Sequence, residues 1–278
     1  MVRFDFFFFE RVWNYVLYVI AGLILFFLVA PIFVVIPLSF NAEPYFSFPM
    51  PGFSTQWYEE LFTTQRWQDV TRTSFIVATS TMVLATILGT LAALGLTMAN
   101  FPMKAVVMGL LISPMMVPPL ITGVGMFFLY SWAGVVYTMP GLILAHTVLA
   151  LPFVVLIVTA TLATFNVNLM RAGANLGANP VTVFFKIVLP MILPGVLGGA
   201  VLAFVASFDE LIIALMISGS DYMTIPRQMW SGVREELNPV ITAAATVLVS
   251  FSILLMGTAE FLRRRNERMR STRFAAGA

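Results

Sequence analysis

The 278-residue sequence contains no cysteine, a single histidine and few charged residues, which make up only 10% of the chain. Without cysteine the chain forms neither disulfide bonds nor thiolate metal sites, although this absence says little about its compartment. The sequence also lacks the Gly-x-x-x-x-Gly-Lys-Ser/Thr phosphate loop, so we expect no ATP site and no other cofactor in this chain. His146, the lone histidine, has no second histidine for a proton relay and is predicted to be a neutral, hydrogen-bonded packing residue.

Hydrophobic residues dominate instead: they account for 60% of the chain, and the mean hydropathy is +0.94. Such a composition excludes an ordinary soluble domain and places the chain in a bilayer. A helix needs roughly 20 apolar residues to cross about 30 Å of hydrocarbon, and the alternating strands of a transmembrane barrel are not visible in the sequence. We therefore predict an all-α polytopic membrane protein with six transmembrane helices, at residues 15–40, 74–97, 105–130, 141–163, 191–217 and 240–262.

The basic residues indicate the side of the membrane on which each loop lies. If the N-terminus is inside, all but four of the 15 lysines and arginines fall in segments that would be cytoplasmic. The four exceptions are Arg66, Arg72, Arg227 and Arg234. Both termini are accordingly predicted to be cytoplasmic, with a short segment at 1–14 and a basic tail at 263–278. This distribution argues against nucleic-acid binding, and the first apolar stretch is too long for a cleaved signal peptide.

Proline and glycine make two of the spans irregular. Pro114, Pro118 and Pro119 argue against a straight helix in the third span. The backbone groups that these prolines free cannot face lipid, so the stretch should lie against protein or a cavity; the alternative is a kink that only helps packing. In the fifth span, Gly195 and Gly199 form a small-xxx-small pair that permits close approach of another helix.

Two segments outside the spans have an amphipathic pattern. Residues 1–14 combine charges with a phenylalanine run at 6–9, which fits either an interfacial helix or a frayed terminus. Residues 41–73 begin with prolines and continue with aromatic residues separated by acids, so we predict a turn followed by an amphipathic helix. Its aromatic side chains, Trp57 and Trp67 among them, are expected at the level of the lipid headgroups.

A polar segment, residues 164–190, separates the fourth and fifth spans and predicts two short helices joined by a turn. A plain connector would need only roughly 5 residues. Gly177 would end the first helix in a left-handed conformation, and Asn179 and Pro180 would cap and begin the second. The second helix would then face the bundle with Val183, Phe184 and Ile187, leaving Arg171, Asn175 and the turn exposed. An exposed turn of this kind can act as a knob for the groove of a partner protein.

This segment resembles the coupling loop of the inner-membrane permeases of ATP-binding-cassette (ABC) importers, and the resemblance covers nearly the whole chain. The family pattern is Glu-Ala-Ala, three residues, Gly, nine residues and then Ile-x-Leu-Pro. Gly177 and the run from Ile187 to Pro190 match it, whereas Arg171 replaces the glutamate and Gly173 the second alanine. The replacement removes any salt bridge made by the usual glutamate and calls for a compensating change in the ATPase surface.

The resemblance also implies an assembly. Residues 15–262 would form a permease domain of the type I ABC importer kind in the bacterial inner membrane, paired with a second, homologous permease. Two ABC ATPase subunits would bind ATP and magnesium, and an extracytoplasmic binding protein would deliver the substrate to the outer loops around Trp57 and at 224–238. The residues implied to contact the ATPase are Arg171, Ala172, Gly173, Leu176, Gly177, Ala178, Asn179 and Pro180.

Asp209 and Glu210 lie inside the apolar sequence of the fifth span, where an ionised carboxylate costs about 3 kcal/mol. About 100° apart on a helix, they would form a cation-attracting wall of the translocation path, or else a buried cap or a bond to a neighbouring helix. Polyamine-type permeases are similar here and at 224–246, except that residues 240–242, Val-Ile-Thr, replace their Glu-Ile-Asn. The resemblance implies a polyamine such as putrescine or spermidine as substrate, with opines, amino-acid derivatives and other small organic cations as alternatives.

The residues leave two other classes to consider. A secondary transporter would bind a proton or sodium ion at Asp209 and Glu210 and would line its site with the broken third span. That reading leaves the long polar loop unexplained. An intramembrane enzyme would have only His146 with Asp209 as its core, and the sequence offers no paired nucleophile. We therefore expect a transport subunit and not an enzyme.

Overall fold

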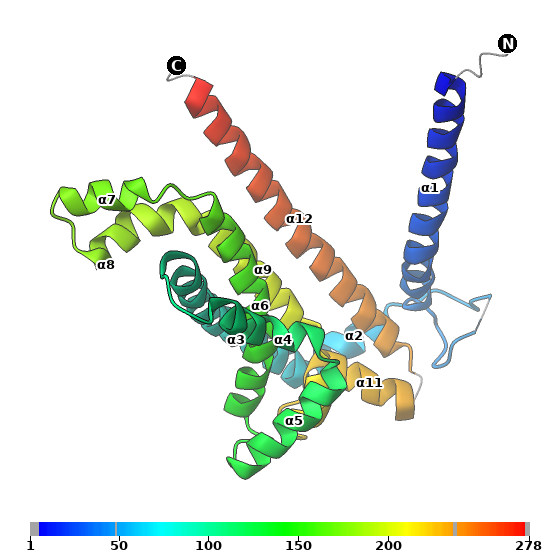
Figure 1. Cartoon of the computed structure of the whole chain (residues 1–278). Helices are drawn as coiled ribbons and strands as arrows, with labels where there is room; N and C mark the ends of the chain where they lie inside the picture. The colour runs from blue at the N-terminus through cyan, green and yellow to red at the C-terminus, as the bar shows by residue number, and fades with distance from the viewer. Residues whose placement is uncertain (1–5, 48, 236–237, 276–278) are drawn as a thin grey trace. The chain divides into compact units, whose positions relative to one another are not determined.

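The computed structural model describes residues 6–47, 49–235 and 238–275, and nearly all of them are helical or join helices (Figure 1). Contacts divide the chain into two units, one reaching to Thr64 and including 232–250, the other formed by 65–231 and the residues from Phe251 on. Within the described ranges the only strand-like pairing is an isolated bridge between Asn41 and Phe53. The helices are α1 (Phe6–Leu38), α2 (Gln56–Thr63), α3 (Gln65–Met98), α4 (Lys104–Met116), α5 (Pro119–Trp132), α6 (Met139–Ala163), α7 (Asn168–Asn175), α8 (Pro180–Val183), the π-helical turn η1 (Phe184–Val188), α9 (Leu189–Phe208), α10 (Ile212–Ile217), α11 (Ile225–Glu235) and α12 (Val240–Ala275).

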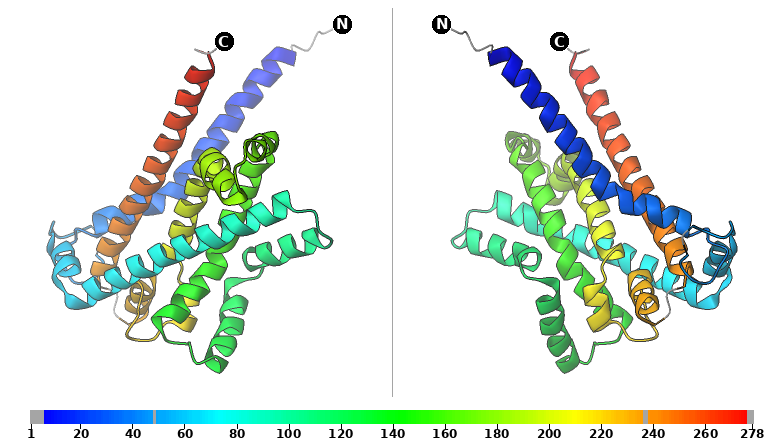
Figure 2. Two further views of the ribbon diagram at one scale, coloured as in Figure 1. Left: turned by 90° about the vertical axis from the view of Figure 1, so that its left-hand side faces the viewer. Right: turned by 90° about the vertical axis from the view of Figure 1, so that its right-hand side faces the viewer.

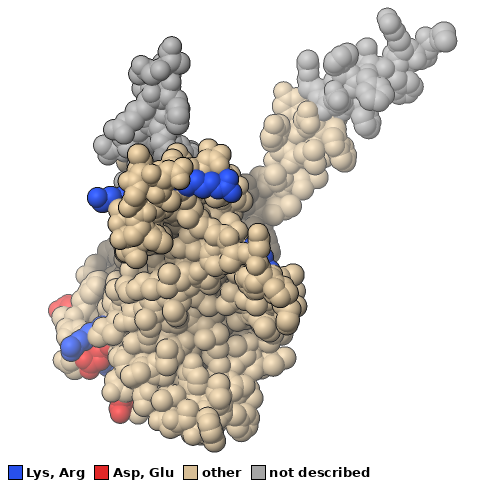
Figure 3. Space-filling model, turned by 60° about the vertical axis from the view of Figure 1, so that its left-hand side comes forward, with Lys and Arg blue, Asp and Glu red and all other residues tan. Residues whose placement is uncertain are grey.

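Five helices in the described part of the chain are long and apolar enough to cross a membrane, and the bent pair α4 and α5 makes a sixth if the pair is one broken span. With that pair counted as one span, the number and order of the spans agree with the prediction. On the face shown in Figure 3 most of the surface is uncharged, and the coloured charged side chains are confined to a few places. The cytoplasmic location of the two termini stays a prediction.

The two ends of the chain extend the first and last helices. Of the predicted segment 1–14, residues 1–5 lie outside the described residues, and the remainder is the beginning of α1. At the other end α12 continues to Ala275, so the predicted basic tail is helical over the residues that the structure describes.

The core of the larger unit lies where α3, α6 and α9 pack together (Figure 2). Glycine allows this close packing. A Cβ on Gly89 of α3 would lie 2.7 Å from the Cβ of Val154 on α6. A Cβ on Gly199 of α9 would lie 3.2 Å from the Cα of the same Val154. Gly195 meets α6 as well, since its Cβ would lie 2.1 Å from Oγ1 of Thr161. The predicted small-xxx-small contact is therefore confirmed, and its partner is α6.

The third span is broken, as its prolines predict. α4 ends at Met116, α5 begins at Pro119, and the two helices are bent by 107°. Beyond the break α5 packs against α10: a Cβ on Gly123 would lie 3.1 Å from Cγ of Met216 and 3.3 Å from Cδ1 of Ile213. Met116 at the break is 80% exposed in this chain. Since α4 packs against α6, both halves of the span have protein neighbours, and the bend between them is exposed.

The fifth span starts earlier and ends earlier than predicted. Its helix runs without interruption from Pro180 to Phe208 through the π-helical turn η1. The buried side chains explain this turn. Val183 and Val188 are five residues apart, whereas Val188, Ile192 and Val196 follow at intervals of four. A π-helical turn bonds residue i to i+5, so it places Val183 on the same face as the later core residues.

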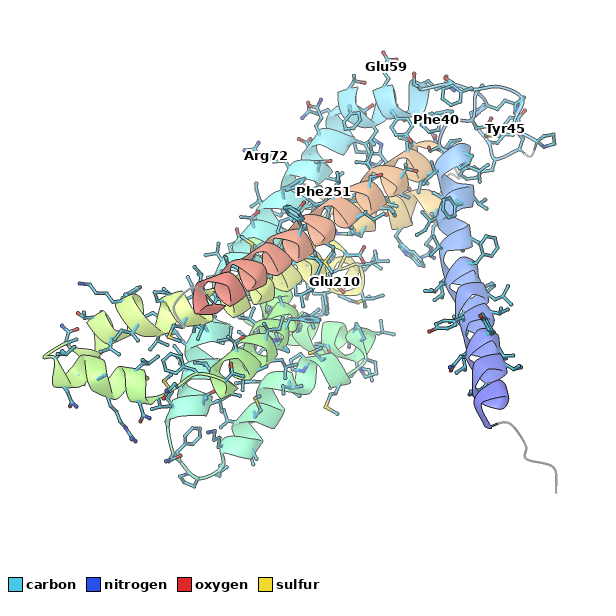
Figure 4. The ribbon with its side chains drawn as sticks, turned by 90° about the horizontal axis from the view of Figure 1, so that it is seen from above. Phe40, Tyr45, Glu59, Arg72, Glu210 and Phe251 are labelled. Atoms are coloured by element: carbon cyan, nitrogen blue, oxygen red, sulfur yellow. The ribbon has the colours of Figure 1, made fainter. Side chains whose placement is uncertain are left out.

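In the smaller unit, the loop after α1 leads into α2, as the predicted turn and amphipathic helix require. The indole N–H of Trp57 donates to the carbonyl of Asn41 at 2.6 Å, and the rings of Phe40 and Phe53 stack with centroids 4.7 Å apart. Phe40 and Tyr45 are labelled in Figure 4. Trp57 is buried in protein, and so is Trp67 in the larger unit. Trp57 binds a backbone carbonyl, and Trp67 already belongs to α3, so both side chains pack inside protein. Their expected position at the level of the lipid headgroups stays a prediction.

Candidate coupling loop and translocation site

The polar segment between the fourth and fifth spans forms two short helices, α7 and α8, joined by a turn at 176–179. Gly177 has φ +85°, the left-handed conformation expected of it. Its N–H donates to the carbonyl of Ala174 at 2.9 Å, and the N–H of Ala178 donates to the carbonyl of Gly173 at 3.1 Å. The two bonds make a Schellman motif, which satisfies carbonyl groups that a helix end leaves free.

The second helix begins at the predicted cap. The backbone of Asn179 is extended, and its Oδ1 accepts a hydrogen bond from the N–H of Thr182 at 2.8 Å. Pro180 occupies the first turn, where a missing N–H leaves no hydrogen bond unmade. A cap of this kind contributes about 1 kcal/mol. The turn is therefore specified by residues next to it in the sequence.

α7 packs against the start of the fifth span through Gly173. A Cβ on this buried glycine would lie 2.6 Å from Cδ1 of Ile187 and 3.4 Å from Cγ2 of Val183. Val183 is buried, and Phe184 and Ile187 are partly buried against the core, as predicted. The glycine that departs from the Glu-Ala-Ala pattern thus permits a closer approach than alanine would.

The surface that the loop exposes is apolar and basic. Leu176 is 89% exposed and Val181 is 64% exposed. Arg171 and Lys186 are exposed as well, and neither has a salt-bridge partner in the described part of the chain. Residues 164–190 contain no Asp or Glu. A complementary surface would therefore be an apolar groove with carboxylates beside it.

The acidic pair does not lie on a helix, which corrects the helical geometry assumed from the sequence. α9 ends at Phe208, and α10 begins only at Ile212. The carboxylate of Glu210 (Figure 4) accepts hydrogen bonds from the N–H of Ile213 at 2.9 and 3.0 Å and from the N–H of Ala214 at 3.1 Å. A carboxylate in this position satisfies free N–H groups and is stabilised by the helix dipole. Glu210 therefore caps α10.

Asp209 has different surroundings, although it is the next residue in the chain. Its side chain is exposed, and within the described residues neither a hydrogen bond nor a salt bridge engages its carboxylate. Phe208, which precedes it, is buried among phenylalanines of α3, α9 and α12, with ring centroids 5.1 to 5.4 Å away. A charged group in such an apolar span is expected to face water or a partner. The carboxylate of Asp209 is thus exposed and unpaired, whereas that of Glu210 accepts backbone hydrogen bonds.

His146 lies on α6, close to Glu210, and is fully buried. Its Nδ1 is 2.9 Å from Oγ of Ser207, and its Nε2 is 3.9 Å from Oε2 of Glu210. The prediction of a hydrogen-bonded packing residue is confirmed. Over residues 6–47, 49–235 and 238–275, no three His, Asp or Glu side chains gather closely enough to hold a metal ion.

The segment before the sixth span, which is predicted to lie outside, is tied to α3 within the larger unit. The N–H of Ile225, the first residue of α11, donates to Oγ of Ser74 at 2.7 Å. The guanidinium of Arg227 donates to the carbonyl of Gly219 at 2.8 Å and to Ser218. Burial lowers the pKa of Arg227 from its ordinary value. The predicted outer contact region at 224–238 therefore contains an anchored helix.

Comparison with known proteins matches these features to one family. The family described as "binding-protein-dependent transport system inner membrane component" matches residues 85–268, which include the polar loop and both carboxylates. The chain is 32% identical over 240 residues to the spermidine/putrescine transport system permease protein PotC of Haemophilus influenzae, covering 86% of this chain and 93% of that protein. It is also 32% identical over 251 residues to the putrescine transport system permease protein PotI of Escherichia coli K12, covering 88% and 89%.

A solved structure has the same fold. A bacterial ABC transporter involved in the import of the acidic polysaccharide alginate contains a chain with a TM-score of 0.73 and 15% identity to this one. The similarity covers 92% of this chain and 96% of that chain. It confirms the predicted fold class, an all-α polytopic membrane fold.

Proposed function

Since this chain belongs to the family of inner membrane components of binding-protein-dependent transport systems, we propose that it carries a small organic polycation, specifically putrescine or spermidine. Relatives named for these polyamines support the proposal. The observation that carries it is Asp209, an exposed carboxylate without a partner among the described residues of an apolar span. Such a group attracts an ammonium ion and repels an anion.

In this proposal Asp209 supplies the negative charge of the path, and Glu210 stays bound to the N-terminus of α10. A charge-assisted hydrogen bond between a carboxylate and an ammonium group is worth about 1.5–3 kcal/mol. One such contact suffices to favour a cationic substrate by roughly ten- to a hundredfold. The apolar residues around it suit the methylene chain of a polyamine.

The loop at 164–190 serves as the docking site for an ATPase in the same proposal. Leu176 and Val181 offer apolar contacts, and Arg171 with Lys186 favours an ATPase surface that carries carboxylates. The docking residues are those of the turn and its flanks: Arg171, Ala172, Gly173, Leu176, Gly177, Ala178, Asn179 and Pro180.

One continuous helix connects the docking site with the path. The 29 residues from Pro180 to Phe208 run as a single helical rod of about 43 Å. The turn precedes its first residue and Asp209 follows its last. A displacement of the turn by the ATPase is therefore passed along the rod to the carboxylate. This supports coupling of ATP hydrolysis to movement of the path.

The assembly needed for this function has further members. A second, homologous permease completes the path, and two ATPase subunits bind ATP and magnesium. An extracytoplasmic binding protein delivers the polyamine to the outer loops, where α11 is the anchored element. The lipid bilayer covers the apolar helices.

The charge at Asp209 is tested by uptake of labelled putrescine into proteoliposomes that contain the whole importer. We expect Asp209→Asn to raise the KM of uptake roughly ten- to a hundredfold while ATP hydrolysis persists. Asp209→Glu, which keeps the charge, is the matched control and should stay within a few fold of the unmodified protein. An unchanged KM for Asp209→Asn would remove Asp209 from the path.

The same vesicles decide between an ATP-driven importer and an ion-coupled secondary transporter. Ionophores collapse the membrane potential and the ion gradients while ATP is supplied to the ATPase side. We expect uptake to continue. Uptake that stops with the gradients and ignores ATP would instead support the secondary transporter.

A further inference from the structure

We propose that His146 is a positioning residue of the translocation path: it holds the break between α9 and α10 and thereby keeps Asp209 exposed. Its importance for transport rests on the proposed function of Asp209, whereas its effect on the break does not. The inference starts from three polar side chains that come from three different elements and meet inside an apolar bundle.

The first element is α6, which carries His146 with none of its surface exposed. The second is the last turn of α9, where Oγ of Ser207 lies 2.9 Å from Nδ1 of the ring. The third is the non-helical link, where Oε2 of Glu210 lies 3.9 Å from Nε2. The imidazole therefore faces both sides of the break. Its Nδ1 faces Ser207 in the last turn of α9, and its Nε2 faces Glu210, the cap of α10.

Local sequence does not explain why the helix stops at Phe208. Residues 206–211 contain neither proline nor glycine, the residues that most often interrupt a helix. The cap formed by Glu210 is local, and we assign the rest of the cause to tertiary contacts. Glu210 binds the N–H groups of Ile213 and Ala214 only when the chain is non-helical before them. Ser207 and His146 hold the preceding turn against α6, so the cap forms at a defined place.

The nitrogen of His146 that faces Glu210 gives a second argument for the positioning role. Nε2 of His146 is buried and has no hydrogen-bond partner within the described part of the chain. An apolar side chain would fill the same space without leaving a polar atom unpaired, so packing alone does not explain a histidine here. An approach of about 1 Å would bring Nε2 within hydrogen-bond distance of the carboxylate. The ring is thus placed to take hold of Glu210 if the cap moves during transport.

The absence of cysteine in this chain allows a direct measurement. In an Asp209→Cys variant, a cationic methanethiosulfonate reagent reports the exposure of position 209, read by mass spectrometry of this subunit in the assembled importer. We expect His146→Leu to slow the labelling at least roughly fivefold, the factor associated with one buried hydrogen bond. In chains that keep Asp209, His146→Leu should raise the KM for putrescine by a similar factor.

Two conservative variants test whether hydrogen bonding or volume matters. An Asn amide nitrogen can take the place of Nδ1 and a Gln amide nitrogen the place of Nε2, so His146→Asn or His146→Gln should restore part of the labelling rate. Thr147→Val is the control. Thr147 is buried beside His146, but its hydroxyl donates only along α6, to the carbonyl of Ile143 at 2.7 Å. This variant should leave both measurements unchanged.

Several outcomes overturn the positioning role. One is a labelling rate in His146→Leu equal to that of the parent. Another is equal loss in the Leu, Asn and Gln variants, which would show that only the shape of the ring matters. If Asp209→Asn leaves the KM unchanged while His146→Leu still slows labelling, the proposed role of Asp209 fails and the positioning of the break by His146 stands.

Discussion

Gly177 allows the conformation of the coupling turn to be separated from contact with a partner. It lies at φ +85°, and a Cβ added there would meet nothing within 4 Å. A side chain at this position therefore clashes with no part of the chain itself. Its cost is conformational, roughly 1–2 kcal/mol for an L-residue in the left-handed region, which is about five- to thirtyfold in the equilibrium of the turn. Asparagine adopts this region more readily than alanine.

The variants Gly177→Ala and Gly177→Asn therefore distinguish a conformational role of the glycine from close contact with a partner. The two causes predict opposite orders of uptake for the two variants. If the glycine only shapes the turn, Gly177→Ala should impair uptake more than Gly177→Asn. If an ATPase docks closely on the turn, the larger amide should impair it more. We expect the second order, with uptake reduced about fivefold by Ala and more than about tenfold by Asn.

The assay is ATP-driven uptake of putrescine in proteoliposomes, together with co-purification of the ATPase and the amount of inserted subunit. Gly134 supplies a matched control, because it has φ +70° with nothing within 4 Å of an added Cβ and lies outside the coupling loop. At Gly134 alanine should be the worse replacement. If Gly177→Asn transports better than Gly177→Ala, close docking at Gly177 is refuted.

Three further predictions concern the helix contacts and the loop surface. Gly195→Ala should lower the stability to thermal unfolding in detergent by about 1–3 kcal/mol, because its Cβ would lie 2.1 Å from Oγ1 of Thr161. Gly198→Ala, whose Cβ would come only within 4.0 Å of another residue, should be neutral in the same assay. Arg171→Glu should weaken ATPase binding by about two- to fivefold, most strongly at low salt, as titration of the ATPase at several ionic strengths will reveal. Asn179→Ala should cost about 1 kcal/mol at the start of α8 and speed exchange of the backbone amide of Thr182 about fivefold, measured by hydrogen–deuterium exchange.

Features that depend on neighbouring residues were predictable from the sequence. A membrane span is a long run of apolar residues, so the positions and order of the spans can be read from the distribution of hydrophobic residues along the sequence. The broken third span follows from Pro114, Pro118 and Pro119, because proline removes a donor and obstructs the previous turn. The coupling turn follows from Gly177 and Asn179 for the same local reason: each satisfies backbone groups within a few residues of itself.

The end of the fifth span was not predictable in the same way. Neither proline nor glycine lies near Phe208, and in the positioning role proposed for His146 the break depends on a residue 61 positions from Ser207 in the chain. A partial signal was present: an acidic residue directly before the apolar run at 211–213 is typical of a helix start. The burial of Trp57 depends likewise on the carbonyl of Asn41, which no local pattern identifies.

The π-helical turn η1 has a consequence for how insertions and deletions would act on this protein. It holds one residue more than an α-helical turn, and it begins within the nine-residue spacing between Gly177 and Ile187 and ends one residue beyond Ile187. Removing one residue from 184–188 would let the turn revert to α-helix and keep Val183 in phase with Ile192. Removing one residue of α9 before Gly199 would instead rotate the rest of the helix by about 100°. Gly199 would then turn away from Val154. The length of this single turn thus sets the angular phase between the start of the helix at Pro180 and its end at Phe208, next to the carboxylate of Asp209.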